Sequence, residues 1–146
     1  MEPDERPPPE PSLSPDLDPD RPDHRARLIA ALGAEPAEDR RRAVAALVRS
    51  NDEALRRTAL TTGFHDPAAA VRRTAMREAA RLDDAAYRSL FEEAAHDPDA
   101  WIRWRAIRAL REMGPGPSLE DIVMAAVDDD ERVRIEAEAA LREVDG

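Results

Sequence analysis

The chain has 146 residues, of which 42% are hydrophobic and 37% are charged, and its net charge is −10. It contains no cysteine, which excludes a disulfide scaffold and a thiolate zinc site. Only 3% of the residues are aromatic whereas 28 are alanine, so the core is expected to consist of small side chains on closely packed helices. No long apolar run and no signal peptide is visible in the sequence, and we therefore expect a cytoplasmic protein without a membrane partner.

Residues 1–22 hold most of the 13 prolines, interleaved with aspartate and glutamate. Proline removes backbone donors and like charges repel, so this segment is predicted to be a disordered tail that increases solubility. Two alternatives are a docking peptide at Pro7–Pro11 and an acidic segment that lies over basic residues of the domain and competes with a ligand. Residues 23–146 are predicted to form one folded domain.

The folded part of the chain repeats with a period of 31 residues. An acid, an arginine and an apolar residue each recur in phase, and each period contains two apolar stripes at helical spacing. The acidic positions are Glu35, Asp66, Asp97 and Asp128; the arginines are Arg41, Arg72, Arg103 and Arg134; the apolar positions are Ile29, Leu60, Phe91 and Ile122.

Proline or aspartate separates the two stripes of each period, so each period predicts two antiparallel helices joined by a turn. The first helices are expected near residues 24–33, 52–63, 83–95 and 118–127, and the second helices near 37–49, 68–82, 99–113 and 131–144. The repeat units therefore span about 24–49, 52–82, 83–113 and 118–144.

Three segments of the chain resemble HEAT repeats. They begin at Asp66, Asp97 and Asp128, and each carries valine or isoleucine five residues later, followed by arginine. The short period is similar to that of the HEAT-like repeats of phycobilisome lyases. The resemblance implies an all-α fold, a right-handed α-solenoid of about four antiparallel helix pairs, with the second helices on the concave side. It says little about function, since this fold hosts scaffolds, lyases, a hydroxylase and DNA glycosylases.

The resemblance also implies that the recurring acids and arginines are structural joints. In such repeats the turn acid and the arginine five or six residues later contribute to a ladder of capping and ion-pair contacts. The residues at these positions are Asp66, Arg72, Asp97, Arg103, Asp128 and Arg134.

The sequence predicts neither a catalytic site nor a metal site. His65 and His96 occupy equivalent turns one repeat apart, a separation of about 10 Å between neighbouring units, which is too far for one metal ion. A glycine-rich phosphate loop and a nucleophile elbow are both missing. We therefore expect a protein that is not an enzyme and needs no cofactor.

The concave side is the predicted binding surface. All 22 basic residues of the chain are arginines, and many fall on the second helices at positions that face away from the core. The predicted partner-binding residues are Arg42, Arg49, Arg73, Arg77, Trp104, Arg108, Arg111, Ile135 and Arg142. The acids expected there are few, Glu112 and Glu138. Trp101 is expected in the core, whereas an exposed Trp104 among arginines is typical of a binding hot spot.

These features favour a non-enzymatic adaptor that binds a protein or an acidic peptide, because arginine recognises carboxylates in a bidentate manner. One alternative is nucleic-acid binding in a groove like that of HEAT-like DNA glycosylases, which the acidic net charge disfavours. A chromophore-lyase-like function is a further alternative and is suggested only by the type of repeat. Apolar residues on the last predicted helix, including Ile135, favour weak end-to-end self-association or a partner that continues the stack.

Overall fold

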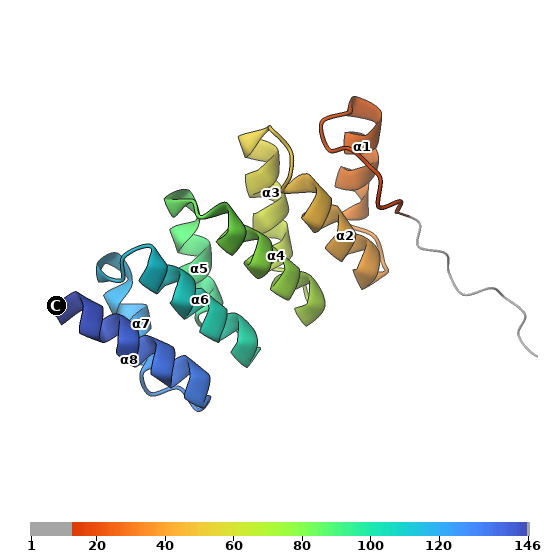
Figure 1. Cartoon of the computed structure of the whole chain (residues 1–146). Coiled ribbons are helices and arrows are strands. Elements are labelled where there is room, and N and C mark those ends of the chain that lie inside the picture. The colour runs from red at the N-terminus through yellow and green to blue at the C-terminus, as the bar shows by residue number, and fades with distance from the viewer. Residues whose placement is uncertain (1–12, 146) are drawn as a thin grey trace, which may run out of the picture.

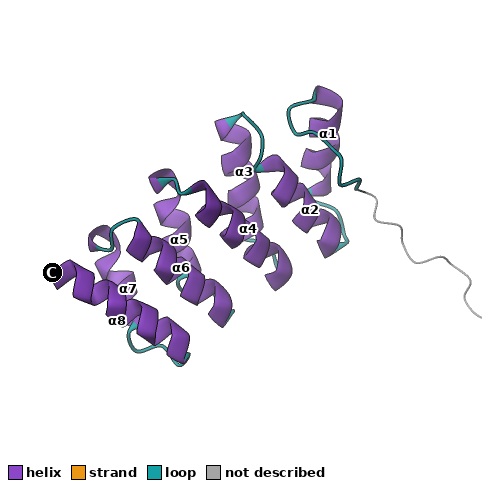
Figure 2. Ribbon diagram, viewed as in Figure 1, coloured by secondary structure: helices purple, strands orange, loops and turns teal. Residues whose placement is uncertain are grey.

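The computed structural model describes residues 13–145, which form helices and connecting turns without a strand (Figures 1 and 2). The first helices of the pairs are α1 (Pro22–Ala31), α3 (Glu53–Phe64), α5 (Arg88–Ala94) and α7 (Leu119–Ala125). The second helices are α2 (Ala37–Leu47), α4 (Ala69–Leu82), α6 (Ala100–Glu112) and α8 (Glu131–Asp145). Two 3₁₀ helices, η1 (Ala85–Tyr87) and η2 (Gly116–Ser118), precede α5 and α7.

The four helix pairs stack in one row, with the second helices in one layer and the first helices in the other (Figure 1). Each second helix contacts the next one along the row, from α2 to α4, α6 and α8. The predicted all-α solenoid is therefore confirmed, and every helix lies within a few residues of its predicted range. The helix α5 is shorter than predicted because its first turn is a 3₁₀ helix, and α7 is shorter because it ends at Ala125.

Small side chains allow the helices to approach one another closely. Ala75, Ala106 and Ala137, which are 31 residues apart, are completely buried at the centre of successive repeats. On α3, a Cβ atom added to Gly63 would lie 2.8 Å from the Cβ of Ala75 and 3.1 Å from a methyl group of Val44. This glycine is therefore required where α3 crosses α2 and α4.

The first repeat follows a spacing of 32 residues instead of 31. Leu28 is completely buried, whereas Ile29, which was predicted for the core, is 46% exposed. Arg40, and not Arg41 of the recurring arginine positions, is the equivalent of Arg72, since Arg40 bonds Asp66 of the next repeat. Both differences arise because the first repeat has one additional residue before the second, so that Leu28 corresponds to Leu60 and Arg40 corresponds to Arg72.

Residues 13–21 do not belong to a tail, although the sequence analysis placed them there. Leu13 and Leu17 are buried, with 4% and 9% exposure. Arg42 on α2 donates a hydrogen bond of 3.3 Å to the carbonyl of Leu13, and Ser50 donates one of 2.7 Å to Asp20. Two leucines four residues apart thus fasten the segment to the N-terminal end of the stack. The tail prediction for residues 1–12, including the docking peptide at Pro7–Pro11, lies outside the described residues.

Candidate functional site

Two of the arginines predicted as joints, Arg72 and Arg103, bond the following repeat as well as their own turn, and Arg40 does the same in the first repeat. In each case Nε donates to the carboxylate of the next repeat, at 2.8 Å for Arg40 and Asp66, 2.9 Å for Arg72 and Asp97, and 2.9 Å for Arg103 and Asp128. The Nη1 atom donates to carbonyls five and six residues earlier, as from Arg103 to Asp97 and Pro98. The ion pair therefore joins the arginine of one repeat to the acid of the next repeat.

Most of the joint residues are shielded from solvent. The Arg103 and Asp128 side chains are only 16% and 12% exposed. Burial raises the pKa of Asp128, but the hydrogen bonds from Arg103 and from the backbone of Asp130, together with the charge of Arg103, outweigh that effect and bring this pKa below its usual value. In turn, Asp128 raises the pKa of Arg103. These contacts join neighbouring repeats and leave little of either side chain accessible to a partner.

Most of the arginines predicted to bind a partner are already paired with acids. Arg73 donates to Asp99 at 3.0 Å, and Arg111 donates to Glu143 at 2.7 Å and to Glu136 at 3.3 Å. The remaining pairs are Arg42 with Glu38, Arg49 with Glu78, and Arg108 with Glu112. The expectation that acids are scarce on this face is wrong, because Glu78, Asp99, Glu136 and Glu143 also lie among its arginines.

Two of the predicted arginines, Arg77 and Arg142, are exposed and form no ion pair with any described residue. Arg142 lies on α8, and Ile135, also on α8, is 55% exposed. Arg77 lies on α4 beside the two tryptophans of α6. An arginine without an ion pair among the described residues therefore lies next to a tryptophan where α4 meets α6.

Four side chains form what we call the Arg/Trp cluster: Arg77, Trp101, Trp104 and Arg108. The guanidinium carbon of Arg77 lies 5.7 Å from the ring centre of Trp101, and that of Arg108 lies 5.7 Å from the ring centre of Trp104. The two indoles are 6.3 Å apart with an angle of 58° between their planes. Both tryptophans are half-buried, so Trp104 is less exposed than predicted. The cluster therefore combines a fixed aromatic base with cations that reach the solvent.

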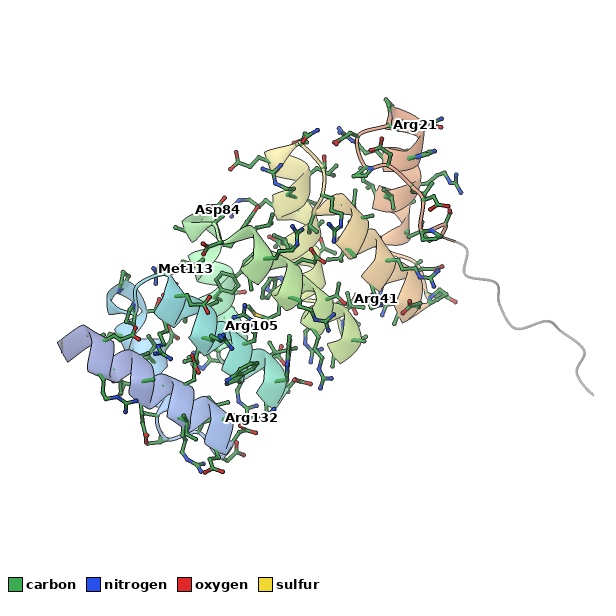
Figure 3. The ribbon with its side chains drawn as sticks, viewed as in Figure 1. Arg21, Arg41, Asp84, Arg105, Met113 and Arg132 are labelled. Carbon is green, nitrogen blue, oxygen red and sulfur yellow. The ribbon has the colours of Figure 1, made fainter. Side chains whose placement is uncertain are left out.

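The sequence analysis missed the part that Trp101 plays in this cluster. Trp101 packs against the core, as expected, yet it also lies beside Trp104. A spacing of three residues places two side chains next to each other on a helix, and this spacing could have indicated the pair. Arg105, labelled in Figure 3, lies on the same helix and adds a further cation; its Nη1 atom is buried without a hydrogen-bond partner in the described part of the chain.

A hollow lies beside the cluster, between α6 and α8. Its volume is about 630 Å³, and it is lined by Arg108, Arg111, Glu112, Glu136 and Glu143. The lining carries both charges and almost no apolar surface. Such a hollow suits the charged side chains of a peptide better than an apolar small molecule.

His65 and His96 each contact an acid of the following repeat. His65 Nε2 lies 2.9 Å from Glu93, and His96 Nε2 lies 2.7 Å from Asp121. Within residues 13–145, no three histidine, aspartate or glutamate side chains are arranged to hold a metal ion. In the same range, none of the helices has the length and apolar character needed to cross a membrane.

Comparison with known proteins agrees with the architecture. A family model described as HEAT repeats matches residues 59–142, which is more than half of the chain. No curated protein matches the chain.

Proposed function

The chain belongs to the HEAT-repeat family, and from this premise we propose that its Arg/Trp cluster binds an acidic peptide or an acidic protein surface. HEAT repeats commonly serve as protein-interaction modules, because a stack of helix pairs offers a long continuous surface. Under this proposal the protein acts as a non-enzymatic adaptor.

The observation that carries the proposal is the set of side chains around Trp101 and Trp104. Half-buried tryptophans give a ligand apolar area at little entropic cost, and they are frequent at binding hot spots. Arg77 lies over one of the rings and has no acid of this chain among the described residues to neutralise it. A carboxylate that reaches Arg77 would gain a charge-assisted hydrogen bond.

The ion pairs around the cluster do not prevent binding. Arg108 and Glu112 are both about half exposed, and such pairs contribute only about 0.2–1 kcal/mol each. A ligand carboxylate can therefore replace Glu112 at Arg108 with little loss. The alternating charges of the neighbouring hollow would then select the order of charges along a peptide.

Tryptophan fluorescence provides a direct test, because both tryptophans of the chain lie in the cluster. Titration with a short polyglutamate peptide is expected to change the emission in a saturable manner, whereas a polylysine peptide of equal length should not. The Arg77→Glu variant is expected to weaken polyglutamate binding at least about tenfold. The matched control is Arg27→Glu, the same charge reversal at an exposed arginine on α1.

Two results would contradict the proposal. One is an equal loss of affinity in Arg77→Glu and Arg27→Glu, which would mean that only net charge matters. The other is saturable binding of duplex DNA at physiological salt with no response to polyglutamate, which would favour the nucleic-acid alternative.

A further inference from the structure

The outer face of α7 and of the turn that follows it is apolar where the preceding repeat is polar. Leu119, Val123 and Val127 follow one another at a spacing of four residues and are 41%, 51% and 84% exposed. The residues 31 positions earlier are Arg88, Glu92 and His96. An exposed end of a repeat stack normally carries polar residues for solubility, and this face has the opposite character.

The polar residues at these positions all contact the repeat that follows them. Arg88 donates a hydrogen bond of 3.0 Å to the hydroxyl of Ser118, and Glu92 accepts one of 2.9 Å from the same hydroxyl. His96 contacts Asp121 on α7. The helix α7 and the turn after it repeat the geometry of α5 and its turn. Leu119, Val123 and Val127 therefore point along the stack, away from α5, toward the position that the next helix pair of a longer stack would occupy.

The helix α8 shows the same unfilled contact. Arg72 and Arg103 each bind the acid of the next repeat, whereas the equivalent Arg134 donates only to the carbonyl of Asp128, at 2.7 Å, among the described residues. Glu138 takes the place of Met76 and Ile107, which are completely buried between second helices, and it is exposed. Neither Arg134 nor Glu138 forms an ion pair with another described residue.

We propose that this end face, consisting of Leu119, Val123, Val127, Arg134 and Glu138, binds the end face of a second copy of the chain about a twofold axis. A twofold interface uses the same patch on both copies and must be complementary to itself. Arg134 and Glu138 meet this condition, since they are one turn apart on α8. When two α8 helices lie antiparallel, each Arg134 meets the Glu138 of the second copy, and the α7 stripes cover each other.

A head-to-tail arrangement is not supported by the opposite end of the stack. That end is covered by residues 13–21, with Leu13 and Leu17 buried against α2. The acid of the joint is also missing there. Arg40 donates a hydrogen bond to the carbonyl of Ala34, and Arg72 donates the equivalent bond to the carbonyl of Asp66. Ala34 therefore occupies the position at which the later repeats have an aspartate. The N-terminal end therefore offers no carboxylate equivalent to Asp66 for Arg134.

Sedimentation velocity of the full chain over a range of concentrations tests the interface. We expect a monomer–dimer equilibrium with no larger species. The triple variant Leu119→Arg, Val123→Glu, Val127→His carries the residues of the preceding repeat and is expected to weaken dimerisation at least about tenfold. Its helicity and melting temperature as a monomer should stay unchanged, because all three positions are exposed. Ile29→Glu, at an exposed apolar residue of the other end, is the control and should leave the dimer intact.

Charge reversal tests the twofold arrangement itself. Glu138→Arg alone places like charges opposite each other and should weaken the dimer, and adding Arg134→Glu should restore it to within about threefold. The proposal is overturned if the unmodified chain stays monomeric at all concentrations, if association continues beyond the dimer, or if the triple variant dimerises as well as the unmodified chain. A charge-reversed double variant that stays as weak as Glu138→Arg would also overturn it.

Discussion

Replacing Arg103 by alanine tests whether the joints hold the stack together. Arg103 donates hydrogen bonds of 2.9 and 3.1 Å to the Asp128 carboxylate, and its Nη1 atom donates to the carbonyls of Asp97 and Pro98. The Arg103→Ala variant loses all of these at once and leaves the carboxylate of Asp128 largely buried without its cation.

The magnitude follows from burial and from the type of bond. Breaking a fully buried ion pair costs about 3–5 kcal/mol, and hydrogen bonds to charged groups contribute about 1.5–3 kcal/mol each. Because the two side chains keep 16% and 12% exposure, water compensates part of the loss. We therefore expect Arg103→Ala to lower the free energy of unfolding by about 2–3 kcal/mol.

Urea denaturation followed by circular dichroism measures this loss, and the same helix offers a control. Arg108 pairs with Glu112 in an exposed i, i+4 contact, so Arg108→Ala should change the free energy of unfolding by no more than about 0.5 kcal/mol. A double-mutant cycle of Arg103→Ala and Asp128→Asn should give a coupling energy of about 1–2 kcal/mol. Equal losses in the two alanine variants, or a coupling energy near zero, would refute the assignment of Arg103 to a joint.

Three further predictions concern packing, the N-terminal segment and pH. Gly63→Ala should lower the free energy of unfolding by about 1–2 kcal/mol in urea, because the new Cβ would lie 2.8 Å from its nearest neighbour, whereas Gly33→Ala, with no contact below 3.8 Å, should not destabilise. Leu17→Ala should cost about 2 kcal/mol in the same assay if the segment is fastened as described, and an unchanged stability would contradict this. Hydrogen bonds from Arg41 lower the pKa of Glu38 from 4.5 to about 2. The ionised Glu38 side chain therefore stabilises the fold above pH 4.5, and this contribution is lost as the pH falls toward 2. The Glu38→Gln variant should accordingly lose less stability than the unmodified chain over this pH range.

The repeat architecture could be predicted because each position recurs under the same geometric constraint. Each of the three turn acids, Asp66, Asp97 and Asp128, accepts a hydrogen bond from the backbone N–H two residues later. Each also forms an ion pair with an arginine of the preceding repeat. A residue tied by several bonds in every repeat reappears at a fixed spacing, and this spacing is visible in the sequence. The family match to residues 59–142 covers the part of the chain where the spacing holds.

The first repeat could not be aligned by residue type. Leu28 and Ile29 are both aliphatic, and Arg40 and Arg41 are identical, so either member of each pair fits a column of the repeat. Only the burial of Leu28 and the bond from Arg40 to Asp66 decide between them. One additional residue is therefore invisible to a periodicity argument when neighbours share their chemistry.

The charge of the second-helix face was misjudged for a related reason. Acids such as Glu136 are visible in the sequence, but the arginine that each one faces depends on how far one repeat is displaced along the next. Arg111 and Glu136 are 25 residues apart, the same separation as Arg72 and Asp97 in the joint ladder. Once one ion pair between repeats is known, the number of residues that separates its partners predicts further pairs. No such pair can be identified from the sequence without the structure.

The two proposed surfaces differ in how they relate to the stability of the stack. In a repeat protein, stability comes largely from the contacts between neighbouring units, so an internal unit has two such contacts and a terminal unit has one. The first repeat gains a second contact from Leu13 and Leu17, whereas α7 and α8 leave apolar and charged side chains exposed at the other end. A second copy on the end face would supply the missing contact and therefore stabilise folding, whereas a ligand at the Arg/Trp cluster would bind helices α4 and α6, which already have neighbours on both sides. Both events stabilise the folded state by mass action, but self-association makes the melting temperature depend on the protein concentration, whereas ligand binding makes it depend on the ligand concentration.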